Sequence, residues 1–135
     1  MSTVHKDSKT SEWFFPEEGY ILSETDENGI IIYVNELFCE IAGYTENELL
    51  GQPHNIIRHP DMPRIAFKGL WDDVQSKGFW DGYVKNARKD GGYYWVYATV
   101  LKKVASNGDI SYLSIRTVPS RIKVQSSEEL YATLK

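Results

Sequence analysis

Turn-forming residues divide the chain into short segments, several of which are rich in the β-branched and aromatic residues typical of strands. Asp26-Glu27-Asn28-Gly29 separates two such segments and predicts a hairpin. Two further turns, at 90–92 and 106–109, separate three more segments. The predicted strands are residues 20–25, 30–34, 80–89, 93–104 and 110–118.

Between the second and third strands, the apolar residues follow helical spacing instead. Asn35 can cap a helix with an apolar stripe of Leu37, Phe38, Ile41 and Ala42, which Gly43 ends. Thr45 and Glu48 have the spacing of a capping box and predict a second short helix.

The segment 52–63 contains three prolines and two histidines, which excludes a long helix there. Pro63 is placed to begin the next helix, which ends near Gly78. The apolar stripe of that helix is Phe67, Leu70, Trp71 and Val74. In the tail, Ser126 and Glu129 again have capping-box spacing and predict the start of another helix.

Two strands, several short helices and three strands predict an α+β fold: one five-stranded antiparallel sheet with short helices covering one face. A cavity between helices and sheet is a natural place for a ligand. We expect the domain to span residues 20–118, after a flexible N-terminal segment or cap over 1–19. Within that segment, Trp13-Phe14-Phe15-Pro16 is expected to pack on the domain. Residues 119–135 are predicted to form a C-terminal linker that can be helical.

Composition narrows the function classes. The 135 residues include 15 Lys and Arg against 19 Asp and Glu, so the net charge of −4 argues against nucleic-acid binding through a basic surface. The single cysteine, Cys39, excludes an internal disulfide and suits a reducing compartment. No apolar run is long enough to span a membrane, and no signal-peptide core is present, so we expect a cytoplasmic domain without direct membrane insertion.

The local sequences resemble a PAS domain. Tyr33-Val34-Asn35 and the segment 43–51 resemble the general PAS signature, which indicates the fold but no ligand. The segment 51–63 (GQPHNIIRHPDMP) is more specific, because it is similar to the flavin-binding PAS domain of bacterial aerotaxis receptors. The segments 80–86, 94–96 and 114–117 are similar to the same family. The resemblance covers about residues 20–118 and implies non-covalent FAD, redox sensing and a chemotaxis output.

The third predicted strand carries the first candidate site. Alternation places Trp80, Gly82, Val84 and Asn86 on one face, which is apolar apart from Asn86 and is expected to face inward. The Asn86 amide carries a donor and an acceptor, which matches the polar edge of an isoalloxazine ring. Trp80 can stack on the ring or wall it, and Gly82 leaves space for it. From the residues alone, Asn86 bonding to backbone and Trp80 as plain core are equally available.

Arg58, His59 and Asp61 form the second candidate site. Arg58 offers a charged fork that suits a pyrophosphate, and His59 can stack or donate a hydrogen bond. Asp61 can accept from hydroxyls or hold Arg58, but it can also cap the helix that begins near Pro63. The resemblance to aerotaxis receptors implies cofactor binding at all three positions.

Four further residues are weaker candidates. Asn35 has a structural role as a helix cap besides a possible ligand role. Tyr94 is expected on the inner face of its strand and can border the ring or simply pack. Arg116, with Ser114 on the same face, resembles in position the glutamine that contacts flavin in LOV photoreceptors. An arginine there could stabilise anionic reduced states.

The sequence is also compatible with other ligands and functions. A LOV-type thiol adduct needs a cysteine after Gly51, but Cys39 lies on the preceding helix, where core packing is expected. A haem sensor would use His54 or His59, although their spacing is no known haem motif. These histidines with Asp61 have no recognisable metal-site spacing either. A ligandless dimerisation or interaction module is the main alternative, and no motif indicates an enzyme.

The expected output is a contact with another protein. The resemblance implies a chemoreceptor signalling domain, on the same native protein or on a separate receptor partner, through which the domain could be membrane-associated. Tyr83 and Tyr93 lie on the outward face of their strands, and exposed aromatic residues on a sheet indicate a docking face. We therefore expect a homodimer or another PAS–PAS contact through the sheet.

Overall fold

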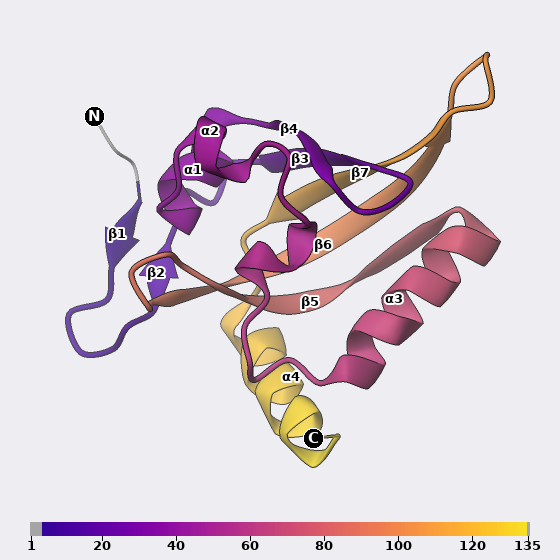
Figure 1. The fold of residues 1–135 in the computed structure, drawn as a ribbon. Coiled ribbons are helices and arrows are strands. Elements are labelled where there is room, and N and C mark those ends of the chain that lie inside the picture. Colours follow the sequence, from indigo (N-terminus) through magenta and orange to yellow (C-terminus); the bar gives the residue numbers. More distant parts are fainter. Residues whose placement is uncertain (1–3, 135) are drawn as a thin grey trace.

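The computed structural model describes residues 4–134 and contains the predicted five-stranded antiparallel sheet (Figure 1). The strand order is β4-β3-β7-β6-β5, which places the first hairpin beside the last strand. The bounds are β3 Ile21–Asp26, β4 Ile31–Val34, β5 Phe79–Ala87, β6 Tyr93–Val104 and β7 Ile110–Thr117. The predicted fold class is confirmed.

The helices between β4 and β5 lie on the inner face of the sheet. They are α1 Glu36–Ala42, α2 Glu46–Leu49, the 3₁₀ helix η1 His54–Ile57 and α3 Arg64–Lys77. Both predicted caps are present: the Asn35 side chain accepts from the Phe38 amide, and Thr45 and Glu48 complete a capping box. The segment 52–63 contains only the single turn of η1, as its prolines require.

The main core lies between α1, α2 and one end of the inner sheet face. Phe38 and Ile41 of α1 are fully buried against Ile21, Tyr94 and Val96 of the sheet. A smaller cluster of Val74, Val100 and Tyr112 lies under the other end of the sheet, where α3 ends. The space between these two clusters is not filled by core side chains, and the candidate site lies there.

Residues 5–15 of the N-terminal segment are more ordered than predicted, and residues 1–3 lie outside the described residues. A loose segment was expected before residue 13, but β1 His5–Lys6 pairs with β2 Trp13–Phe14, and Glu12 is buried. The segment packs on the domain because Glu12 accepts two hydrogen bonds from Arg121 and Phe15 enters the core. The expected packing of residues 13–16 on the domain is confirmed for Phe15.

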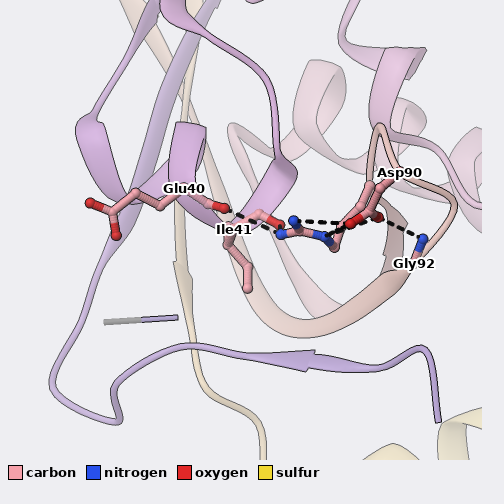
Figure 2. A network of polar contacts seen from close by, with 5 residues as sticks. Glu40, Ile41, Asp90 and Gly92 are labelled. Carbon is pink, nitrogen blue, oxygen red and sulfur yellow. Dashed lines mark hydrogen bonds and ion pairs between the residues drawn. The ribbon is translucent and has the colours of Figure 1, made fainter. Parts of the chain in front are cut away.

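Arg88, directly after β5, holds three neighbouring segments together. Its guanidinium donates to the backbone carbonyls of Glu40 and Ile41 at the end of α1 and pairs with Asp90 in the β5–β6 turn. Figure 2 shows these carbonyls on one side of the network, with Asp90 and Gly92 on the other. The same guanidinium stacks on Trp13 at 3.6 Å, so one buried charge joins α1, the turn and the N-terminal segment.

The C-terminal helix, α4 Arg121–Thr133, begins earlier than predicted. Ser120 is its cap and accepts from the Lys123 amide, so the helix is already formed at Ser126, whose hydroxyl donates to the Lys123 carbonyl. The expected start at Ser126 is therefore wrong, because the serine after Pro119 caps first. None of the helices in residues 4–134 is long and apolar enough to cross a membrane.

Helix α4 lies on the outer face of the sheet, opposite α3. The Tyr131 ring stacks on Trp95, and its hydroxyl donates to the Tyr83 carbonyl at 2.7 Å. Tyr83 and Tyr93 are half-buried rather than exposed, since α4 and Lys85 contact them. The expectation of an exposed aromatic pair at that end of the sheet is wrong.

Candidate functional site

A cavity of about 260 Å³ lies between the inner face of the sheet, α3 and the segment around η1. Its size is just below the ~300 Å³ at the lower end of small-molecule sites. The walls differ in chemistry. Helix α3 and strands β5 and β6 contribute mainly apolar groups, whereas β3 and β7 contribute polar ones: Ser23, Thr25, Ser114 and Arg116.

Arg116 is the central group of this polar wall. It is 4% exposed, and no acidic side chain among the described residues pairs with it. Its guanidinium donates to Ser23 Oγ at 3.1 Å and to His54 Nε2 at 2.6 Å, and it faces the Phe38 ring at 5.2 Å. Burial lowers the pKa of Arg116 to about 10, so the group is still charged at neutral pH.

His54 is held neutral by this arrangement. Burial of the ring and the charge of Arg116 lower the pKa of His54 to about 3. Because an arginine can only donate, Nε2 must accept, which places the imidazole proton on Nδ1. The Nε2 lone pair is thus already used, and His54 would have to leave Arg116 before that nitrogen could bind a haem iron.

Three polar atoms that line the cavity have no hydrogen-bond partner among the described residues. They are Thr25 Oγ1, Ser114 Oγ and Asn86 Nδ2. The Tyr94 hydroxyl lies beside the Asn86 side chain, its neighbour across β5 and β6, without meeting hydrogen-bond geometry. Buried polar groups of folded proteins are nearly always paired, so this set indicates a polar ligand or water in the cavity.

Of the nine candidate residues predicted from the sequence, four line the cavity: Arg116 and Ser114 of the polar wall, Asn86 and Arg58. Asn86 is 3% exposed and lies on the inner face of β5, as its alternation predicts. Arg58 is half-buried, lies over the Phe67 ring at 4.6 Å and forms no ion pair with a described residue. The β-bridge between Arg58 and Asn86 places both at one side of the cavity.

Two predicted residues belong to the neighbouring core. Trp80 faces inward, but its indole folds back over Gly82, so the space expected there for a ligand is occupied by this side chain. Tyr94 is completely buried behind Asn86, and burial raises the pKa of Tyr94 to about 12. Neither residue is part of the cavity lining.

The remaining three predicted residues have contacts elsewhere. His59 Nδ1 accepts from the Asp61 amide, and its ring packs edge-on against Tyr93. The Asp61 carboxylate pairs with Lys85 at 2.8 Å. The Asn35 amide bonds the Phe38 and Leu22 amides and the Tyr20 carbonyl, which fully explains it as a structural residue.

Two features were not predicted from the sequence: the pairing of His54 with Arg116, and the contribution of β3 to the cavity wall. His54 was considered only as a haem or metal ligand, although it supports Arg116 instead. Ser23 and Thr25 alternate with Leu22 and Glu24, and both are buried. Two hydroxyl residues on the buried face of a central strand are a signal that could have identified the polar wall.

The comparisons with known proteins agree with this architecture. The model of the PAS fold matches residues 31–116, and the chain therefore belongs to the PAS family. It is 41% identical over 114 residues to the aerotaxis receptor of Escherichia coli (strain K12), which covers 84% of this chain and 22% of the receptor. The predicted resemblance is confirmed.

Other relatives are more distant. The chain is 30% identical over 91 residues to the nitrogen fixation regulatory protein of Klebsiella oxytoca, covering 67% of this chain and 18% of that protein. It thus spans about a fifth of the length of these two curated relatives.

Solved structures support the fold alone. The Aureochrome1 LOV domain in its light state has a TM-score of 0.68 at 20% identity, covering 84% of this chain and 88% of that chain. A PAS domain from Colwellia psychrerythraea has a TM-score of 0.68 at 23% identity, covering 76% and 87%.

The neutral His54 predicts a defined pH dependence of stability. The unfolded histidine takes up a proton below about pH 6.5, whereas the folded one resists protonation down to about pH 3. The unfolded state therefore binds more protons in this window, and stability falls as pH is lowered. We expect the free energy of unfolding to drop by up to about 2 kcal/mol between pH 7 and pH 5.

Denaturant unfolding at several pH values checks this expectation. His54→Gln should remove most of the drop, whereas His5→Gln, at an exposed position, should retain it. An unchanged pH dependence in His54→Gln would contradict the account of the His54–Arg116 pair.

Proposed function

We propose that this PAS domain binds FAD non-covalently and reports cellular redox state, or electron-transport activity, to a chemotaxis signalling complex. The observation that carries the proposal is the polar wall of the cavity. It presents a buried cationic donor, Arg116, and three buried polar atoms that have no partner within residues 4–134, opposite apolar surfaces.

The donor set suits a flavin. An isoalloxazine ring is flat and largely apolar, with acceptors and one donor along its pyrimidine edge. Phe67, Leu70 and Val100 supply apolar walls for such a ring. Asn86 can donate through Nδ2, which has no partner in the described part of the chain, and the Thr25 and Ser114 hydroxyls can donate or accept. These residues and Arg116 would hold the ring.

FAD rather than a smaller flavin is proposed because of Arg58. This arginine lines the cavity, is partly open to solvent and forms no ion pair with a described residue, so its fork is available for a pyrophosphate. Trp80, Tyr94, Asn35, His59 and Asp61 stay predictions as cofactor contacts. Either His59 or Asp61 would have to turn from its present partner to reach the cavity.

A bound flavin supplies reversible electron transfer. The chain's own contribution is to make the contacts of Arg116 and Asn86 depend on the charge of the ligand. A more negative ligand strengthens the hydrogen bonds from Arg116 at the expense of those to Ser23 and His54. Because Arg116 lies on β7, between β3 and β6, a shift of its contacts acts on the central strands. Two states with different contacts are sufficient for a switch.

The relatives support the proposed output. The aerotaxis receptor supports a chemotaxis context, and a light-oxygen-voltage domain studied with a flavin analogue, which shares the fold at a TM-score of 0.66, supports a flavin. We therefore propose a cytoplasmic signalling role without catalysis, with any membrane association provided by a partner or by another part of a longer protein.

The absorption spectrum of protein purified without added cofactor tests this proposal. We expect flavin bands, release of FAD on denaturation and reversible bleaching by dithionite. A Soret band would instead indicate haem. A colourless protein that takes up no added FAD would favour a ligandless interaction module.

A matched pair of variants tests the cofactor contact of Arg58. Arg58→Ala should weaken FAD binding about tenfold or more, because a charge-assisted contact to phosphate is lost. Arg64→Ala removes an exposed arginine six residues away and should leave binding unchanged. Equal FAD affinities in a fluorescence titration, with unchanged circular dichroism, would show that Arg58 does not hold the cofactor.

We further propose that the outer sheet face beyond α4 is the contact surface for a second copy. Phe79 and Leu101 are 52% and 37% exposed and face each other across β5 and β6, next to Leu113 on β7. Such a strip of apolar groups favours association.

Light scattering tests the second copy directly. The domain should have twice the chain mass of 15.5 kDa, and Phe79→Glu should reduce it to the chain mass. A wild-type monomer at high concentration, or a dimer unaffected by Phe79→Glu, would contradict this surface.

A further inference from the structure

Helix α3 buries little of its surface against the rest of the domain. Of its 14 residues, only Val74 is buried. The other residues of its predicted apolar stripe, Phe67, Leu70 and Trp71, are half-buried and line the cavity. The first part of the helix therefore lies over the cavity and reaches the two core clusters only through these partly buried side chains.

The chain is anchored to the domain on both sides of the first part of α3. Before the helix, Met62 is 4% exposed and its sulfur accepts from the Lys85 amide at 3.4 Å. At the helix end, Val74 packs with Val100 and Tyr112, and the Gly78 carbonyl accepts from the Lys102 amide at 2.9 Å. Residues between these two anchors are the ones above the cavity.

The helix has little stability of its own between the anchors. Its N-cap is Pro63, which makes no side-chain capping bond, and no acidic residue lies in the first turn. Gly69 is an interior helix residue with open space around it, and glycine disfavours helix. The Lys68–Asp72 pair is exposed and contributes little. A helix of 14 residues is marginal without tertiary contacts.

Trp71 shows what the first part of α3 closes. Its indole lies within ordinary contact of the position that a Cβ on Gly29 would take, and it packs edge-on against Tyr112 at 5.1 Å. The β3–β4 turn and α3 thus meet at Trp71, on one side of the cavity. Loosening of this part of α3 would open the cavity there.

We propose that residues 64–73, here called the strap, are ordered by what fills the cavity, and that ordering of the strap reports occupancy on the protein surface. Phe67, Leu70 and Trp71 bury only part of their surface against the two core clusters, and a bound ligand adds apolar contacts on the side that faces the cavity. The identity of the ligand rests on the proposed function, but the dependence of the strap on cavity filling does not.

Amide hydrogen exchange with and without FAD tests the proposal. In the flavin-free protein, the amides of 67–73 should exchange at least tenfold faster than those of 75–78. FAD should slow exchange in 67–73 at least tenfold while changing 75–78 less than twofold. Uniform exchange along the helix in the flavin-free protein, or FAD binding without protection of the strap, would overturn the proposal.

Filling the cavity from the protein side separates this proposal from the choice of ligand. Ala98 is 3% exposed and lines the cavity, so Ala98→Phe should protect the strap without any flavin. Ala105→Phe, in the exposed β6–β7 turn, is the control and should change nothing. Val84→Phe, at another cavity-lining position outside the Val74 anchor, replaces Ala98→Phe if circular dichroism shows that the latter misfolds.

The outcomes are distinguishable. Strap protection in Ala98→Phe, together with a wild-type chain that binds no FAD, would support the strap and contradict the proposed cofactor. FAD binding with an unprotected strap, or a strap that stays unprotected in the folded Ala98→Phe variant, would contradict the strap. Gly69→Ala should slow strap exchange about fivefold in the flavin-free protein, since alanine favours helix at this open position.

Discussion

The site depends on one constraint: the Arg116 guanidinium is buried, and no carboxylate of the described residues pairs with it. Desolvation of an isolated charge costs several kcal/mol, and Arg116 recovers only part of it from Ser23, the neutral His54 and the face of Phe38. Each of these neighbours is fixed by another element: Ser23 by β3, His54 by η1 and Phe38 by α1. The guanidinium can therefore gain a further partner only from the cavity that it lines.

The rest of the fold keeps this cavity open. Helices α1 and α2 fill one end of the sheet with Phe38, Ile41 and Leu49, and the end of α3 fills the other end with Val74. The first part of α3 spans the gap between them. The central strands thus present a polar surface to a space with apolar walls, which is how ligand sites combine orientation with affinity.

Much of this could be predicted from local sequence. Turn residues and caps have local causes, so the hairpin at 26–29 and the caps at Asn35 and Thr45 were predicted correctly. Alternation was sufficient to place Asn86 on the buried face of β5. The start of α4 was misplaced because two serines offer caps, and local spacing does not decide which one acts first.

The incorrect predictions at the site concern contacts that depend on tertiary structure. Whether Trp80 walls a cavity or folds over Gly82 is decided by a rotamer, which spacing does not determine. The His54–Arg116 hydrogen bond joins residues 62 positions apart and depends on tertiary structure. Burial of Tyr83 beneath α4 likewise depends on a helix that docks from the far end of the chain.

We conclude that Arg116 contributes to ligand binding and not to the stability of the fold. The substitution Arg116→Met tests this conclusion most directly. FAD affinity by fluorescence titration and unfolding of the flavin-free protein should be measured together. The account predicts at least tenfold weaker FAD binding, with a flavin-free protein as stable as the wild type or more so, because the methionine side chain needs no charge partner. Unchanged FAD affinity together with a strongly destabilised fold would contradict it.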